Sequence, residues 1–379
     1  MELFIGIVIG LFVLVVLVVL HELGHAIVAH RNGVVVEEFG IGLPPRAWGK
    51  KLKSGVLFSL NWLPIGGFVK LKGEHDSATK KGDYGAATFW QKTKILLAGV
   101  VVNWLIAVTL LTGLALVGLP KAINNQFSVP GDTVTTTGPV KLGSIVKDYP
   151  AATAGFQKGD AIVSLAGEKV DSTTEFTELT KQHKGQTVSI VYVRDGKQSE
   201  QKVTLRDSDK ALFGSTLGQE QTIRATWSAP IVGVVTTAQF TVVTLQGLGH
   251  LIGDFFGGLF AQLSSSEATR AQGSANLDEA ANSVAGPIGI LGTIFPAAGK
   301  GGIVSVLFLS AIISLTLAVM NILPIPALDG GSWFLMAVFK ILKKPLTKDL
   351  EEKIKGTGFL VLLALIALVT IGDVAKLFA

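Results

Sequence analysis

The chain has 379 residues, of which 49% are hydrophobic and 16% are charged, and its formal net charge is +5 at pH 7. This composition is more apolar than that of a soluble globular domain, and it excludes disordered, low-complexity and collagen-like proteins. Cysteine is absent, which excludes disulfides, thiolate metal sites and cysteine nucleophiles. Any metal must therefore be bound by His, Asp or Glu.

The first apolar run extends from Leu3 to Leu20 without a charge and continues to His30 without a helix breaker. This length is sufficient to cross a bilayer. A cleaved signal peptide is the alternative, but no basic segment precedes the run and no small-residue cleavage site follows it. We therefore predict a first transmembrane helix over residues 1–30.

Three further apolar runs predict transmembrane helices over residues 95–119, 303–330 and 357–377. The segment 227–302 begins with an apolar stretch, Trp227 to Phe260, that also carries Gln, His, Asp and several Gly residues. An interfacial amphipathic helix is favoured there, and a further span is left open. The predicted fold class is a polytopic α-helical membrane protein with about four transmembrane helices.

Two loops that are rich in Lys and Arg, residues 31–94 and 331–356, predict the orientation of the chain. Such loops stay on the cytoplasmic side, whereas long segments are exported regardless of their charge. We expect a multi-pass protein of the inner or plasma membrane, with the lipid bilayer as its surroundings. The basic excess is then a topology signal, and no nucleic-acid partner is expected.

The predicted exported segment, residues 121–226, contains a small β-rich domain at about 140–206. Alternating residues in Thr187–Val193 are followed by the hairpin dipeptide Asp195-Gly196. The stretch Gly155–Gly167 resembles the signature of PDZ domains, although an unrelated small β domain is the alternative. PDZ domains bind extended peptide ends by adding a strand to a sheet edge, so peptide ends are an expected partner.

Strand-like pieces also occur in the basic loop, at Val34–Val36 and Phe68–Leu71, and Gly- and Pro-rich turns join them. Unpaired strands cannot lie in lipid. This segment therefore either forms a hairpin at the membrane surface or packs between helices, and we predict a membrane-associated β-hairpin within residues 31–94.

The motif His21-Glu22-Leu23-Gly24-His25 fits H-E-x-x-H. Residues i and i+4 lie on one face of a helix, so His21 and His25 can bind one zinc ion while Glu22 lies beside the metal-bound water. Two buried, hydrogen-bonded histidines are the alternative interpretation. Ionisable groups at membrane depth are costly and usually functional, which favours a catalytic zinc site.

A hydrolytic zinc usually has three protein ligands. Val28 and Arg31 exclude the longer motif H-E-x-x-H-x-x-G-x-x-H. Carboxylates of the basic loop are candidates for the third ligand, namely Glu37, Glu38 and Glu74. Asp329 is the better candidate because it follows the third span on the same side of the membrane as His25. Its alternative role is an Asp-Gly turn.

The HELGH motif in the first span, the pattern N-x-x-P-x-x-x-L-D-G at residues 321–330 and the interposed PDZ-like segment resemble the site-2 protease family of intramembrane zinc metalloproteases. The similarity is to the bacterial, regulator-of-sigma-E protease-like form with a single PDZ domain. Pro64–Lys70 is similar to the membrane-associated hairpin of that family, and Ala285–Ile290 is a further supporting segment. Val100 departs from the Ala-Gly-Pro that is usual for the family in the second span.

The resemblance implies that His21, His25 and Asp329 bind zinc and that Glu22 is the general base and later the proton donor. It also implies that Asn321 steadies the substrate or the oxyanion, which agrees with the ability of an amide to donate a hydrogen bond. A helix-terminal cap is the alternative role of Asn321.

The implied activity is cleavage of the transmembrane segment of a single-span substrate, such as an anti-sigma factor or a remnant signal peptide, in regulated intramembrane proteolysis. A zinc or cation transporter is the rival interpretation, because His and Asp within a membrane can also form an ion pathway. A membrane scaffold that uses its PDZ-like domain is the third.

Overall fold

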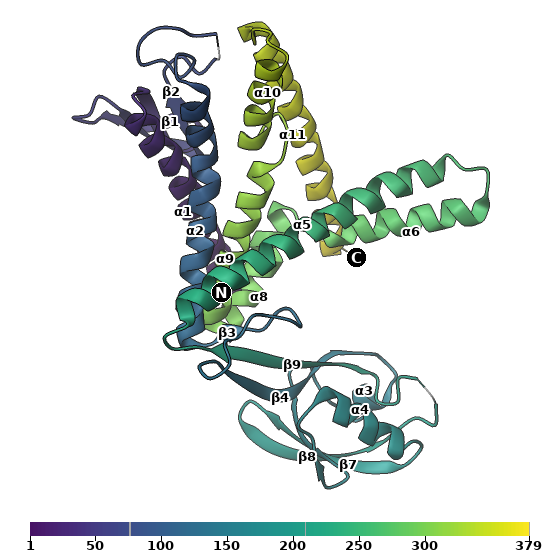
Figure 1. Ribbon diagram of the computed structural model, residues 1–379. Coiled ribbons are helices and arrows are strands. Elements are labelled where there is room, and N and C mark those ends of the chain that lie inside the picture. Colours follow the sequence, from purple (N-terminus) through teal and green to yellow (C-terminus); the bar gives the residue numbers. More distant parts are fainter. Residues whose placement is uncertain (76, 209, 379) are drawn as a thin grey trace. The chain divides into compact units, whose positions relative to one another are not determined.

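The computed structural model describes residues 1–75, 77–208 and 210–378, and the chain divides into two compact units (Figure 1). Unit 1 comprises Met1–Leu114 and Ala229–Ala379, and unit 2 comprises Ala115–Ser228. Unit 1 contains the long apolar helices, and unit 2 contains most of the β-structure (Figure 1).

Among the described residues, five helices are long and apolar enough to cross a membrane. They are α1 (Glu2–Arg31), α2 (Phe89–Val117), α5 (Ala229–Gln262), α9 (Gly302–Ile322) and α11 (Lys348–Phe378). Four of them overlap the segments predicted to span, and the fifth, α5, is the segment for which the sequence favoured an interfacial position. The predicted span 303–330 is divided between α9 and α10 (Asp329–Ile341), and α11 begins nine residues before the predicted start at 357. By length and composition α5 is also sufficient to span, because it continues for 34 residues without a break.

The remaining helices of unit 1 are short or polar. They are α6 (Glu267–Ser283), α7 (Pro287–Gly289), the π-helical turn η1 (Ile290–Ile294), α8 (Phe295–Lys300) and α10 (Asp329–Ile341). The α6 helix and the segment 287–300 form a bent pair with an angle of 47° that together is also long enough to cross. Pro287 and Pro296 each stand in the first turn of a helix, where a missing N–H costs nothing.

Small residues let the helices of unit 1 approach closely. A Cβ at Gly24 of α1 would lie 2.8 Å from Val102 of α2, and one at Gly10 would lie 2.6 Å from Phe295 of α8. Hydrogen bonds add to this packing, because Ser314 of α9 donates to the carbonyl oxygen of Asn103 in α2 at 2.8 Å. These close approaches and this hydrogen bond hold α1, α2 and α9 together.

The predicted β-hairpin is formed by β1 (Val36–Lys51) and β2 (Leu57–Leu71), which pair antiparallel. Two parts of β2 pair with the first half of β1, one along each of its edges. Gly40, for example, pairs with Ser59 on one edge and with Phe68 on the other. Residues 67–71 therefore form an outer strand of this sheet. Gly67 lies against α1, where a Cβ would be 3.5 Å from Cγ of Glu22.

Unit 2 is built around a sheet with the strand order β3-β9-β4-β5-β7-β8, with β6 paired to β5. The strands are β3 (Leu119–Pro120), β4 (Val134–Ile145), β5 (Ala161–Leu165), β6 (Glu168–Lys169), β7 (Thr187–Arg194), β8 (Lys197–Thr204) and β9 (Ser215–Arg224), and the helices are α3 (Pro150–Thr153) and α4 (Thr173–Gln182). The Asp195-Gly196 turn joins β7 to β8, as predicted, and both residues have positive φ. The sheet extends beyond residues 140–206, because β9 pairs with β4.

Candidate active site

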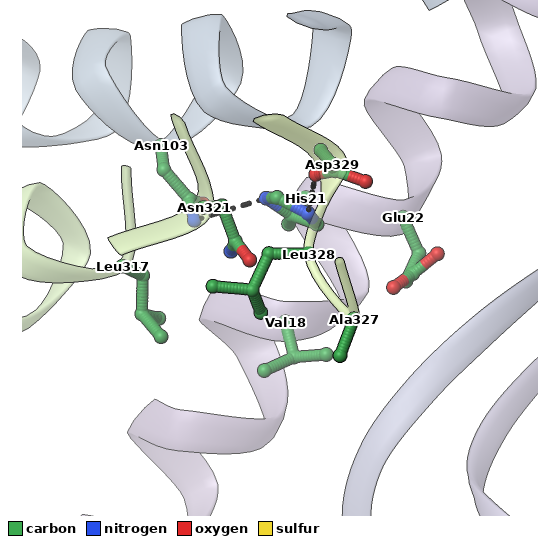
Figure 2. Close-up of a pocket in the computed structure, with 9 residues that line it drawn as sticks. All are labelled: Val18, His21, Glu22, Asn103, Leu317, Asn321, Ala327, Leu328 and Asp329. Atoms are coloured by element: carbon green, nitrogen blue, oxygen red, sulfur yellow. Dashed lines mark hydrogen bonds and ion pairs between the residues drawn. The ribbon is translucent and has the colours of Figure 1, made fainter. Parts of the chain in front are cut away.

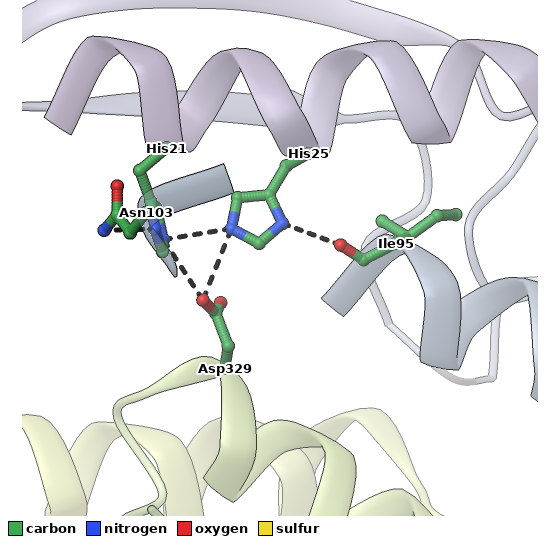
Figure 3. Close-up of polar contacts among 5 residues, drawn as sticks. All are labelled: His21, His25, Ile95, Asn103 and Asp329. Carbon is green, nitrogen blue, oxygen red and sulfur yellow. Dashed lines mark hydrogen bonds and ion pairs between the residues drawn. The ribbon is translucent and has the colours of Figure 1, made fainter. Parts of the chain in front are cut away.

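The imidazoles of His21 and His25 lie on one face of α1, and the carboxylate of Asp329 at the start of α10 faces them (Figure 3). The two Nε2 atoms are 3.1 Å apart. Asp329 Oδ2 lies 3.2 Å from Nε2 of His21 and 3.3 Å from Nε2 of His25. A tetrahedral zinc ion with bonds of about 2.0–2.1 Å separates its ligand atoms by about 3.3–3.4 Å. The three donors could therefore hold such an ion and leave a fourth position for water.

Both imidazole rings are buried, and each has a partner for its other nitrogen (Figure 3). Nδ1 of His25 lies 2.7 Å from the carbonyl oxygen of Ile95. That oxygen can only accept, so Nδ1 carries the proton and Nε2 keeps its lone pair for a metal. A hydrogen bond from the second ring nitrogen is the usual way in which proteins orient a histidine ligand.

Asn103 of α2 orients the ring of His21. Its Nδ2 is placed 3.1 Å from Nδ1 of His21, while its buried Oδ1 has no hydrogen-bond partner among the described residues. The nitrogen and oxygen of an amide are exchanged by a simple flip. With Oδ1 towards the ring, the oxygen accepts from Nδ1–H, and Nε2 of His21 is free for a metal. The flipped amide thus gives both histidines the same tautomer.

Gly99 of α2 provides the space in which the two imidazoles meet. A Cβ at this position would lie 2.4 Å from Nε2 of His25 and 2.5 Å from Cε1 of His21. Contacts below 3.0 Å essentially never occur for a real Cβ. A residue without a side chain is therefore required where α2 passes the histidines.

The chain between α9 and α10 places Asp329. It turns sharply, and a Cβ at Gly330 or Gly331 would lie 2.1 Å or less from the carbonyl oxygen of Ile322 or Ile325. The Trp333 indole on the next turn donates to Oγ1 of Thr93 at 3.1 Å and so holds α10 against α2. The Asp-Gly-Gly sequence is thus the first turn of α10, and its two glycines leave room for the sharp connection of residues 323–328 that places the carboxylate.

Two cavities meet at Glu22 and Asp329. The first has a volume of about 210 Å³ and is lined by Val18, His21, Glu22, Asn103, Leu317, Asn321, Ala327, Leu328 and Asp329 (Figure 2). The second has a volume of about 280 Å³ and is lined by Glu22, His25, Val69, Leu71, Glu74, Tyr84, Ile95, Leu96, Asp329, Ser332 and Lys355. Glu22 therefore borders both, and Asn321 at the end of α9 borders the first.

The structure brings together four of the five residues that the sequence singled out, and it places Asn321 in the same cavity as His21 and Glu22 (Figure 2). The loop carboxylates do not join the histidines. Glu37 lies 3.4 Å from Lys70, Glu38 lies 3.9 Å from Arg46, and Glu74 borders only the second cavity.

Sequence reasoning missed the supporting residues Asn103, Gly99 and Ile95. A signal for Asn103 was available, because it is an amide in an otherwise apolar span, and polar groups at membrane depth are usually functional. No sequence signal identifies Ile95, since its contribution is a backbone carbonyl.

The model of peptidase family M50, the site-2 protease family, matches residues 9–365. The chain belongs to this family, and it is a zinc metalloprotease. The predicted family, enzyme class and cofactor are confirmed.

Individual relatives agree with this assignment. One relative is a Clostridium perfringens protein whose name describes it as a zinc metalloprotease. It is 30% identical over 94% of this chain and 95% of its own length. The regulator of sigma-W protease RasP from Bacillus subtilis is 25% identical over 96% of both chains. Among solved structures, the PDZ domain of an SdrC-like protein from Listeria monocytogenes is 29% identical over 24% of this chain and 93% of that domain, with a TM-score of 0.19.

Proposed function

We propose that this zinc metalloprotease cleaves the transmembrane segments of single-span membrane proteins in regulated intramembrane proteolysis. The observation that carries the proposal is the position of the donor triangle. His21 and His25 lie on a helix of 30 residues that is long and apolar enough to span, and Asp329 reaches them from the start of α10. A substrate bound at these donors would be cut at membrane depth.

In this proposal His21, His25 and Asp329 bind the zinc ion. The ion, when bound, lowers the pKa of a coordinated water and polarises the scissile carbonyl. Glu22, which borders both cavities, takes a proton from the attacking water and then delivers it to the leaving amide nitrogen. The amide of Asn321 donates a hydrogen bond to the oxygen on which negative charge develops.

A substrate helix has its amides bonded internally, so it must unwind locally before one of its carbonyls can react. We propose that the outer strand of the hairpin, residues 67–71, binds the unwound segment by strand addition. Gly67 packs against Glu22, which places this strand next to the general base. Val69→Pro should then lower cleavage at unchanged zinc content, and normal turnover in that variant would count against strand addition.

The direction of the helices limits the possible topologies. The α1 helix runs towards His25 and α9 runs towards Asp329, so both helices run towards the same end of the site. Between them α2 returns, so the chain from α5 to α8 must cross an even number of times. Either α5 and the bent pair both cross, or neither does. The basic loops at 31–94 and 331–356 favour the cytoplasmic side for the site and the exported side for unit 2.

We further propose that the PDZ-like domain in unit 2 admits substrates only after another protease has shortened them, either by size exclusion or by recognition of a new peptide end. Anti-sigma factors and remnant signal peptides are substrates of this kind. The chain enters and leaves unit 2 at adjacent strands, because Leu119 pairs with Ile223. Residues 119–224 can therefore be replaced by a short Gly/Ser linker, and that variant should cleave full-length substrate.

The decisive experiment compares purified wild type with Glu22→Gln on a model transmembrane substrate, with zinc measured in both. We expect zinc near one ion per chain in both proteins, and cleavage reduced by about 10²- to 10⁴-fold in the variant. Glu37→Gln, which changes an exposed carboxylate away from the donors, is the matched control. If wild type binds zinc but does not cleave the transmembrane substrate, the result would contradict the proposed intramembrane cleavage of that substrate.

A further inference from the structure

The outer strand of the hairpin has one edge that is not paired with another strand. On its inner side, Phe39 of β1 pairs with Val69 and Val36 pairs with Leu71. Within residues 1–75, 77–208 and 210–378, no strand pairs with its other side. The N–H of Lys72 donates inward, to Val35 at 2.9 Å. Because backbone groups alternate along a strand, the N–H groups of Val69 and Leu71 point to the open edge.

The donor at Leu71 already has an acceptor within the enzyme. The N–H of Leu71 donates to Oε1 of Glu74 at 2.6 Å. Leu71, Glu74, Val69 and Glu22 all border the second cavity. The edge that would bind a substrate main chain is therefore already occupied, at its Leu71 donor, by a side chain of the enzyme itself.

Glu74 is suited to occupy this edge reversibly. It is an exposed residue three positions after the end of the strand, so its side chain can turn away without moving the strand. Lys355, which pairs with Glu351 at 2.6 Å, borders the same cavity, so a cation lies near a displaced carboxylate. Charge-assisted hydrogen bonds are about twice as strong as neutral ones, so the carboxylate competes effectively with the neutral carbonyl of a substrate.

We infer that Glu74 is a latch on the substrate-binding edge: its carboxylate holds the Leu71 N–H, and an extended substrate main chain must displace it to add a strand. This inference rests on the proposed strand addition. Once Glu74 is displaced, the substrate main chain can pair with the edge from Leu71 towards Val69 and so approach Gly67, which packs against Glu22.

The latch predicts a specific kinetic signature for Glu74→Ala. If the edge is open in about one fifth of the molecules, removing the carboxylate lowers KM about fivefold and leaves kcat within about twofold. Glu74→Gln keeps an acceptor oxygen at the same position but loses the charge, so its KM should lie between the values of Glu74→Ala and wild type. Glu37→Ala is the matched control, because Glu37 is an exposed carboxylate that pairs with Lys70 of the same strand at 3.4 Å. Its KM should not change.

Kinetics should be measured on the full-length enzyme with a single-span model substrate, together with zinc content and hydrogen exchange at the Leu71 amide. We expect faster exchange at Leu71 in Glu74→Ala and slower exchange when substrate is bound. An unchanged or raised KM in Glu74→Ala would overturn the latch, since a raised KM means that Glu74 helps to bind the substrate.

Two readouts separate the latch from strand addition. If Val69→Pro cleaves normally, strand addition fails and the latch fails with it. If Val69→Pro loses activity while Glu74→Ala behaves as wild type, the latch alone fails. Hydrogen exchange requires no turnover, so unchanged exchange at Leu71 in Glu74→Ala refutes the latch even with a substrate that is not cleaved.

Discussion

Replacement of Gly99 by Ala should destroy the metal site while leaving the helix intact. The added Cβ would lie 2.4 Å from Nε2 of His25 and 2.5 Å from Cε1 of His21. Ordinary contacts of a Cβ begin at 3.4 Å. At least one imidazole must therefore move by about 1 Å.

The magnitude of the effect follows from the narrow range of bond lengths in a zinc site. Its bond lengths vary by only about 0.2 Å, so a shift of about 1 Å removes a ligand from the tetrahedron. Loss of a residue that merely supports a ligand costs about 10- to 100-fold in metal affinity. We expect Gly99→Ala to reach at least the upper value, about 100-fold, which corresponds to about 2.7 kcal/mol of binding free energy.

Gly113→Ala is the matched control. Gly113 lies on the same helix, and a Cβ there would meet no atom within 4 Å. Both substitutions increase helix propensity by up to about 1 kcal/mol, so a general effect on α2 would appear in both variants. Zinc affinity is measured by competition with a chelator on the purified proteins in detergent, and the thermal unfolding of both variants is recorded alongside.

Equal zinc affinity in Gly99→Ala and Gly113→Ala would refute the reasoning. It would mean that the imidazoles of His21 and His25 do not lie against Gly99. A collapse of thermal stability in the zinc-free protein of Gly99→Ala alone would also count against it, because the predicted effect is on the imidazoles and not on the packing of α2.

Three further predictions concern other contacts. Asn103→Leu removes the group that orients His21, so zinc affinity should fall about tenfold; an unchanged affinity in the chelator assay would exclude this role. Arg194 contacts the buried Asp160 at 2.6 Å, so Arg194→Met leaves that carboxylate without a cation. The free energy of unfolding of unit 2 should fall by about 3 kcal/mol, which is measured as faster hydrogen exchange in β5 and β7. Lys141→Met, which removes the cation of an exposed pair, should change little. Burial alone would raise the pKa of Asp160, but the hydrogen bonds from Arg194 and from the N–H of Gln157, together with the charge of Arg194, outweigh it and hold this pKa below its usual range. The contribution of this pair is therefore complete above the unfolded pKa of about 4 and is lost as the pH falls through the lower folded value, so a pair that stabilised more at lower pH would contradict the assignment. Asp373→Ala deprives two buried or half-buried amides at the start of α7 of their acceptor, at 3.2 and 2.7 Å, and should lower stability by about 1–3 kcal/mol in thermal unfolding with zinc affinity unchanged.

Several features could be predicted from the sequence because they depend on local order. The spacing of His21 and His25 is that of a helix face, and residues of positive φ at Asp195-Gly196 are typical of a tight hairpin. The apolar runs are long enough to mark the spans. Whether α5 spans was less predictable, because its apolar stretch carries polar residues and glycines, and such a composition fits both a spanning and an interfacial helix.

By itself, the sequence determined the class of enzyme, and it predicted a zinc-binding pair with its base and a short list of third ligands that already favoured Asp329. The tertiary structure decided which carboxylate meets the histidines, because that depends on how closely α1, α2 and α10 approach. It also showed the space at Gly99, the contact of Asn103 with His21 and the bond of Glu74 to the strand edge. Such properties arise from atoms that are distant in the chain, and no local period or motif records them.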